Sequence, residues 1–228
     1  KNYYKYSKLK FKNHQIIFGN FQSKKLICNI IKKYNINVIF HLGASTQVLN
    51  ALTNPENTYK NNIMGTINIL EAIRLLNPKI ILIYASSDKA YGEKNINNYK
   101  EKDKLHSIFP YDVSKSASDL ICQSYSKTYS LSVGILRCTN LYGPGDFNLK
   151  RIIPETIIKS IKKEKLTIRS NGKLTRDYLF VEDAVKAYIL VMKSLLKSKK
   201  NKLLIYNVSS KFNSNVINLV KNIQLKIN

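Results

Sequence analysis

The chain is poor in cysteine and acid, has no tryptophan, and lacks any long apolar run. Its three cysteines, Cys28, Cys122 and Cys138, are too far apart for a zinc site or a disulfide framework. We therefore interpret them as small buried residues in a reducing cytoplasm. No apolar run approaches the roughly 20 residues that a membrane-spanning helix needs. A soluble cytoplasmic protein without a membrane partner is expected.

Only 14 acidic residues face 38 basic ones, so the net charge is +24. This excess suggests nucleic acid as a partner. However, only five of the basic residues are arginine, whose guanidinium group is the favoured hydrogen-bond donor to nucleic-acid bases and phosphates. The lysines are spread along the whole chain, and no DNA- or RNA-binding motif is present. We expect no specific nucleic-acid binding. The three histidines lack the spacing of metal ligands, and no metal site is predicted.

Apolar, β-branched runs alternate with helical patterns over the first 140 residues. This alternation is typical of βαβ units and a parallel sheet covered on both faces. The pattern predicts strands at 15–18, 37–42, 79–85 and 132–140, and helices at 23–34, 55–76 and 111–129.

The pattern is looser after residue 145, where we expect a small substrate lobe at 146–228 that is interleaved with the domain at 1–145. Residues 197–202 (KSKKNK) are predicted to form a solvated loop. For the rest of this part we predict helices at 151–163 and 182–197 and strands at 166–168, 178–180 and 204–208.

Three polar residues, Ser87, Asp88 and Lys89, follow the predicted strand at 79–85. Ligands of parallel sheets bind at the carboxyl ends of the strands, so a hydroxyl, a carboxylate and an amine meet where chemistry is expected. Taken alone, the run is equally well explained as a polar turn.

The next helix begins with Tyr111 and Lys115, which are four residues apart and share one helix face. An ammonium near a phenol favours the phenolate and lowers its pKa from about 10. Tyr111 is therefore a candidate general base for a sugar hydroxyl. A lone Tyr-x-x-x-Lys pattern is weak, but its place one βα unit after Ser87 strengthens it.

Together, Ser87, Tyr111 and Lys115 resemble the Ser/Thr-Tyr-Lys triad of short-chain dehydrogenases/reductases. Nearly the whole chain resembles the extended branch of that family, the NAD-dependent epimerases and dehydratases. The stretches concerned are 40–44 (FHLGA), 62–72 (NIMGTINILEA), 137–144 (RCTNLYGP) and 176–184 (RDYLFVEDA).

The resemblance implies an α/β, Rossmann-like doubly wound parallel sheet, NAD as cofactor, a nucleotide-diphosphate sugar as substrate, and a homodimer through the helices at 55–76 and 111–129. It implies cofactor binding by Asn20, Phe21, Leu42, Gly43, Ala44, Asn62, Tyr111 and Lys115. The planar guanidinium groups of Arg151 and Arg176 and the strand-end amide of Asn140 suit a diphosphate sugar. These three are therefore the candidate substrate residues. We interpret His41 as structural.

Asp88 and Lys89 favour a 4,6-dehydratase over an epimerase. Elimination of water between C5 and C6 needs an acid and a base, whereas an epimerase needs only a hydride removed and returned. The Asp-Lys pair looks like CDP-glucose 4,6-dehydratase, although residues 45–47 and 142–144 depart from that group and leave the base of the nucleotide open. A sugar 4-epimerase and a non-catalytic remnant of the same fold remain alternatives.

No Gly-rich dinucleotide loop precedes residue 19, where the family carries one in its first βαβ unit. Residues 18–21 (FGNF) resemble a later turn beside the adenine, with Asn20 in the place of an acid. We therefore expect a fragment that lacks the first βαβ unit and binds NAD weakly or not at all.

Overall fold

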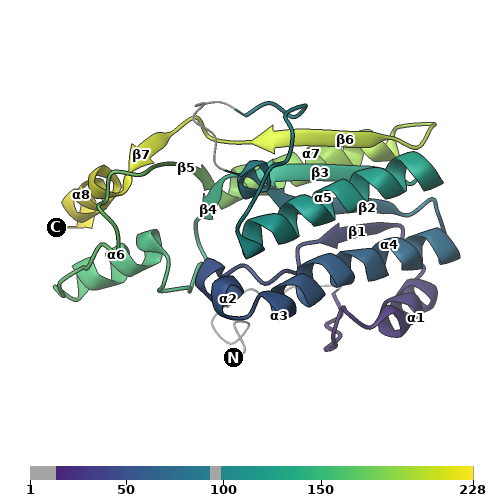
Figure 1. The fold of residues 1–228 in the computed structure, drawn as a ribbon, viewed down its shortest axis with the longest axis horizontal. Helices are drawn as coiled ribbons and strands as arrows, with labels where there is room; N and C mark the ends of the chain where they lie inside the picture. The colour runs from purple at the N-terminus through teal and green to yellow at the C-terminus, as the bar shows by residue number, and fades with distance from the viewer. Residues whose placement is uncertain (1–13, 93–98, 228) are drawn as a thin grey trace. The chain divides into compact units, whose positions relative to one another are not determined.

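A computed structural model describes residues 14–92 and 99–227. By their contacts, the residues form two compact units. Among the described residues, the larger unit comprises those within Phe18–Cys138 and Val185–Val208, and the smaller one comprises Thr139–Ala184, 209–227 and 14–17. The chain thus leaves the larger unit and returns to it (Figure 1). The division of cofactor and substrate roles between 1–145 and 146–228 stays a prediction.

The larger unit is built on a four-stranded sheet in which every neighbouring pair is parallel. Its order is β1 (Val38–His41), β2 (Ile81–Ser87), β3 (Val133–Cys138) and β6 (Leu203–Val208). All six residues of β3 are buried, as expected for a strand with helices on both sides. The predicted parallel α/β fold is confirmed.

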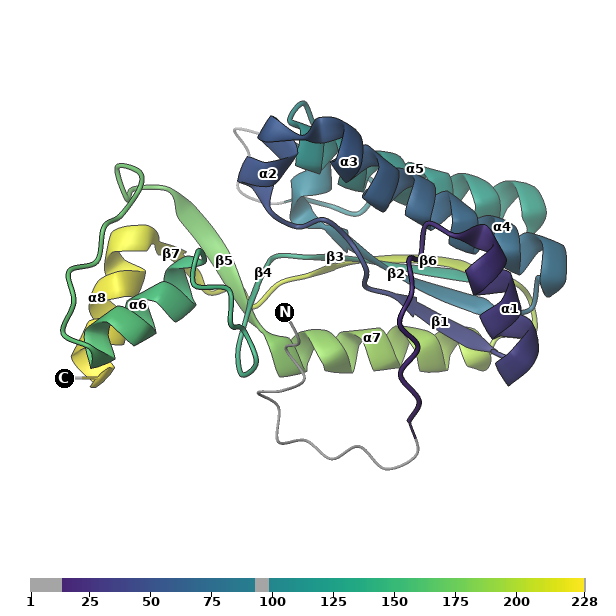
Figure 2. The same cartoon turned by 90° about the horizontal axis from the view of Figure 1, so that it is seen from below.

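Helices cover both faces of this sheet. Figure 2 shows α4 (Gly65–Leu76) and α5 (Pro110–Tyr129) on one side and α7 (Val181–Leu196) on the other. The first helix, α1 (Lys24–Tyr34), packs against α4. The core contains apolar side chains of α4, β2 and β3, including Leu70, Ile73, Leu82, Val133 and Ile135.

Local chemistry sets the helix ends. The Ser23 hydroxyl caps α1 by accepting a hydrogen bond from the amide of Leu26, and left-handed Asn35 ends the helix. Pro110 fits the first turn of α5 because its missing N–H would have no partner there. These two helices and α7 agree with the sequence-based prediction within two residues.

The predicted helix at 55–76 contains a wider turn that the sequence pattern did not reveal. It consists of α3 (Pro55–Tyr59), a π-helical turn η2 (Lys60–Met64) and α4. The carbonyl of Asn62 accepts hydrogen bonds from the hydroxyls of Thr66 (2.6 Å) and Ser118 (3.0 Å). These hydroxyls provide hydrogen-bond donors for a backbone carbonyl that the π turn removes from the regular helical hydrogen-bond pattern.

The smaller unit has a three-stranded sheet in the order β4 (Asn140–Tyr142), β5 (Thr175–Phe180) and β7 (Asn213–Asn215). β4 is parallel to β5, and β7 is antiparallel to it. Two helices, α6 (Ile152–Ile161) and α8 (Val216–Ile227), pack against each other. α8, β7 and the short α2 (Val48–Thr53) of the larger unit were not predicted.

Two predicted strands are wrong. Residues 15–18 are outside any strand, and Phe18 is 81% exposed. Residues 166–168 are likewise irregular, after a left-handed residue at Lys163 turns the chain. Short runs rich in apolar residues form a strand only where a neighbouring backbone pairs with them, and neither run has such a neighbour among the described residues.

None of the helices within residues 14–92 and 99–227 combines the length and the apolar character needed to cross a bilayer. The cysteines are all unpaired, and two of them, Cys122 and Cys138, are buried.

Candidate active site

The carboxyl end of β2 carries the predicted hydroxyl, acid and amine. Ser87 is the last residue of the strand, and Asp88 and Lys89 open the 3-10 turn η3 (Asp88–Tyr91). The Ser87 hydroxyl donates a hydrogen bond to Asp88 Oδ1 (3.0 Å) and accepts one from the Lys89 amide (3.2 Å). All three side chains are half-buried. The hydroxyl proton of Ser87 is therefore coupled to the charge of Asp88.

Lys115 brings a buried ammonium to the same strand. Its side chain is 5% exposed, and Nζ donates a 2.5 Å hydrogen bond to the Ala85 carbonyl, two residues before Ser87. The ring of Tyr84 lies beneath it at 5.0 Å. Burial lowers the pKa of Lys115 from 10.5 to about 8, which leaves it mostly charged at neutral pH.

Tyr111 lies half-buried in the first turn of α5, one turn before Lys115. The helix packs against both β2 and η3. The structure thus places the elements that carry the five predicted catalytic residues against one another. That Tyr111 faces the side chains of residues 87–89 across one cavity stays a prediction.

Asn62, one of the predicted cofactor residues, joins three segments of the larger unit. It is 2% exposed and lies in the π turn η2. Its amide nitrogen donates to the Ser114 hydroxyl (2.8 Å) and to the Ser45 carbonyl (3.1 Å). Its amide oxygen accepts from the Ser45 backbone N–H (2.7 Å). The side chain therefore ties the loop after β1 to the beginning of α5.

The loop after β1 exposes the backbone that the resemblance assigns to the cofactor. Leu42 is 61% exposed, Gly43 is also exposed, and Ala44 is half-buried. The ring of Phe21 packs beside Gly43 and so closely on Gly65 that a Cβ there would lie 2.2 Å from it. Asn20 is exposed, and its Oδ1 accepts a hydrogen bond from the Gln22 amide.

These features fit a dinucleotide that runs along an exposed strand end. The Leu42 and Gly43 backbone is open, and the Lys115 ammonium can donate to hydroxyl oxygens. Within the described residues no cluster of side chains suits a metal ion.

His41 is packed beneath this loop as a structural side chain. Its Nε2 lies 2.9 Å from the Thr66 hydroxyl, and its ring contacts the rings of Phe21 and Tyr84, at centroid distances of 5.8 and 5.6 Å. Burial, assisted by the charge of Lys115, lowers its pKa from 6.5 to about 4. The neutral imidazole is therefore the form that the fold accepts.

This pKa predicts a pH dependence of stability. The unfolded chain binds a proton at His41 near pH 6.5, but the folded chain does so only near pH 4. The free energy of unfolding should therefore fall as the pH drops through this window, by up to about 3 kcal/mol. We expect His41→Gln to flatten the urea-denaturation profile between pH 6.5 and 4. An unchanged slope, or equal flattening by His106→Gln at an exposed position, contradicts this explanation.

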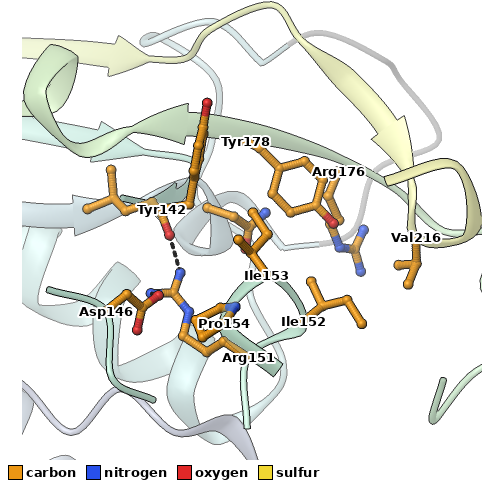
Figure 3. Close-up of a pocket in the computed structure, with 11 residues that line it drawn as sticks. Tyr142, Asp146, Arg151, Ile152, Ile153, Pro154, Arg176, Tyr178 and Val216 are labelled. Carbon is orange, nitrogen blue, oxygen red and sulfur yellow. Dashed lines mark hydrogen bonds and ion pairs between the residues drawn. The ribbon is translucent and has the colours of Figure 1, made fainter. Parts of the chain in front are cut away.

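The three predicted substrate residues line one cavity of about 260 Å³ in the smaller unit (Figure 3). Asn140 belongs to β4, Arg176 to β5, and Arg151 lies at the start of α6. The remaining walls are formed by Leu141, Tyr142, Asp146, Ile152, Ile153, Pro154, Tyr178 and Val216.

The two arginines of this cavity differ in their partners. Arg151 forms a 2.8 Å ion pair with Asp146 and donates to the Leu141 carbonyl. Arg176 donates to the carbonyl of the preceding Thr175 (3.2 Å). Two guanidinium groups and the Asn140 amide at one apolar-walled cavity can receive a phosphorylated ligand.

Sequence reasoning missed Asp119 and Arg137, which form a buried ion pair in the larger unit. A signal was present in the polar residues on the inward face of α5. Ser114, Lys115, Ser118 and Asp119 recur at helical spacing where a core-facing helix would be apolar. Buried polar rows of this kind indicate a hydrogen-bond network.

Together, the parallel sheet, Ser87 at the end of β2, and Tyr111 and Lys115 on the helix α5 that packs against β2 define an α/β protein of the short-chain dehydrogenase/reductase type. The model of the NAD dependent epimerase/dehydratase family matches residues 2–209. The chain belongs to this family.

Named relatives agree with this assignment. A dTDP-D-glucose 4,6-dehydratase of Dictyostelium discoideum is 33% identical over 226 residues, which cover 94% of this chain and 50% of that protein. The human dTDP-D-glucose 4,6-dehydratase is 30% identical over 92% of this chain and 58% of its own length. This chain therefore spans about half the length of these relatives.

Solved structures also match. A Bacillus anthracis dTDP-glucose 4,6-dehydratase in complex with NAD has a TM-score of 0.80 and 29% identity, covering 92% of this chain and 63% of that one. A Thermotoga maritima UDP-glucose 4-epimerase with UDP-glucose has a TM-score of 0.84, with 93% of this chain and 68% of that one covered. At 22% identity, the latter match shows the fold alone.

Proposed function

We propose that the protein is an NAD-dependent nucleotide-sugar 4,6-dehydratase, a lyase that forms a 4-keto-6-deoxy sugar nucleotide. The observation that carries this proposal is the Ser87-Asp88-Lys89 sequence at the end of β2, against the helix that begins with Tyr111 and Lys115. The dehydratases among the named relatives support the same reaction.

The first role belongs to Tyr111, which removes the proton of the C4 hydroxyl as a phenolate. The buried positive charge of Lys115 stabilises that phenolate, and Ser87 accepts or donates a hydrogen bond at the same hydroxyl. NAD, when bound along Leu42, Gly43 and Ala44, supplies the acceptor for the hydride of C4 and its return to C6.

The second role belongs to Asp88 and Lys89. Oxidation at C4 acidifies the C5 proton, which the Lys89 side chain removes as the base. Protonated Asp88 gives its proton to the C6 hydroxyl as the C6–O bond breaks, so that water leaves. Because the Ser87 hydroxyl donates to Asp88, proton loss from Asp88 is coupled to the hydroxyl that assists Tyr111.

A direct test is turnover of CDP-, dTDP- and UDP-glucose with NAD by the protein expressed at its full encoded length. Mass spectrometry should show loss of water, and deuterium from the solvent should enter C5. Interconversion of C4 epimers without loss of water would establish the 4-epimerase alternative and overturn the dehydratase. No turnover and no nucleotide-sugar binding would favour the non-catalytic alternative.

We assign the diphosphate of the substrate to the cavity of the smaller unit, where Asn140, Arg151 and Arg176 meet. A charge-assisted hydrogen bond contributes about 1.5–3 kcal/mol. Arg176→Met should therefore raise KM about 10- to 100-fold and change kcat little. Arg169→Met is the control because Arg169 binds Glu155 and does not line the cavity. Equal effects of the two substitutions would contradict the assignment.

We further propose a homodimer that forms through the helical run at 55–76 and α5. These helices pack side by side, and they expose the apolar side chains of Met64 (46%) and Leu120 (51%). The three unpaired cysteines support a reducing location, and we propose the cytoplasm.

A further inference from the structure

We propose that Arg137 is a positioning residue that holds the segments carrying the predicted catalytic side chains in register. Its kinetic consequence rests on the proposed function, whereas its structural consequence does not. Arg137 lies at the end of β3, where it pairs with Ser86 of β2. Its side chain is 1% exposed, so it contacts no solvent that could replace its partners.

The guanidinium of Arg137 forms a two-pronged ion pair with Asp119 of α5. Both bonds, from Nε and Nη2, are 2.9 Å long. Asp119 is 0% exposed and also accepts hydrogen bonds from Ser86 (2.6 Å) and Gln123 (2.7 Å). Charge and geometry are therefore satisfied on both sides, which a buried pair requires.

The remaining nitrogen of Arg137, Nη1, holds a second segment. It donates to the Tyr91 hydroxyl (2.8 Å) and to the Glu101 carbonyl (2.9 Å). Tyr91 donates in turn to Asn207 (2.6 Å) and stacks on Tyr99 at 4.6 Å. Asn207 binds the Tyr99 carbonyl and the Glu101 carboxylate (both 2.9 Å). We call these six residues, Tyr91, Tyr99, Glu101, Asp119, Arg137 and Asn207, the arginine clasp.

Each end of the clasp adjoins the candidate active site. Ser86, which binds Asp119, directly precedes the predicted catalytic hydroxyl. Asp119 lies one helical turn after Lys115 on α5. Tyr91 ends η3, the turn that begins with the predicted acid and base.

The clasp also reaches the approach to Tyr111. The His106 amide donates to the Tyr91 carbonyl (3.4 Å), and the hydroxyls of Ser107 and Ser116 are 2.6 Å apart. The chain from Tyr99 to Ser107 is thus fixed at both ends immediately before α5 begins. Five donors in a rigid plane allow one guanidinium to hold α5, η3 and this segment together, which a lysine or an apolar side chain cannot do.

The test compares Arg137→Lys with the wild type by hydrogen–deuterium exchange and steady-state kinetics. Lysine keeps the charge beside Asp119, so the fold is retained, but it cannot also reach Tyr91 and the Glu101 carbonyl. We expect exchange at 86–91 and 99–107 to rise at least about tenfold, with α1 and β1 unchanged. We expect kcat to fall about 100-fold with KM within about twofold, because small misplacements of reacting groups mainly reduce kcat.

The matched control is Arg74→Lys on α4. Arg74 also forms a two-pronged pair, with Glu71, and also lies over an aromatic ring, that of Tyr129 at 5.1 Å. It has no partner in the clasp and should leave kcat and exchange at 86–91 unchanged.

Several outcomes would overturn the proposal. Exchange that rises uniformly over the larger unit would assign Arg137 a general structural role, and local loosening with unchanged kcat would remove its role in positioning. If the wild type turns over no nucleotide sugar, the proposed function fails, while the exchange data still decide whether Arg137 holds these segments.

Discussion

Tyr111→Phe is expected to lower kcat by about 10²- to 10⁴-fold, the range for loss of a positioned general base. Phenylalanine fills the same space but cannot carry the proton of the C4 hydroxyl. The fall should be seen both in product formation and in the absorbance of reduced cofactor at 340 nm, because the first step is affected. KM should change little, since the ring remains.

Tyr129→Phe at the other end of α5 is the control for this substitution. It removes the same oxygen from the same helix at a position that is 46% exposed. Full activity of Tyr111→Phe, or an equal loss in both variants, would show that the phenol is not the base.

Asp88→Asn is expected to separate oxidation from elimination. Asparagine keeps the shape and can still accept the hydrogen bond from Ser87, but it cannot give a proton to the departing C6 hydroxyl. Reduced cofactor should therefore still form in a single turnover, while release of water falls by about 10²-fold or more. The paired measurement is absorbance at 340 nm and mass analysis of the product.

Asp183→Asn provides the control, because Asp183 lies exposed in the first turn of α7. Normal elimination by Asp88→Asn would exclude this carboxyl as the acid. Loss of both steps would indicate that Asp88 serves the first step or supports the site as a whole.

Much of the larger unit follows from periodicity alone. Apolar runs predicted β2 and β3, and the apolar stripe within residues 23–34 predicted α1, which the structure ends at the left-handed Asn35. The positions of these elements are set by their own residues and close sequence neighbours, through burial on both faces of the strands and capping of the helix. The fully buried β3 is the extreme case, since Arg137 is the one charged residue among its six.

The features that the sequence did not predict depend on residues that are far away along the chain. Residues 15–18 have the composition of a strand but no neighbouring backbone to pair with among the described residues. Arg137 belonged to a recognised motif, yet its role depends on Asp119, Tyr91 and Glu101, which lie 18, 46 and 36 residues away. No local pattern indicates which of several acids a buried arginine will meet.

The π turn at Lys60–Met64 also limits how this chain can tolerate insertions and deletions. A regular helical turn closes between residues four apart and a π turn between residues five apart, so removing one residue there would eliminate the wide turn and redirect the Asn62 side chain. Asn62 would then face away from Ser45 and Ser114, and the loop after β1 would lose its tether without any change in composition. At this turn the length of the segment, as well as its chemistry, is under constraint.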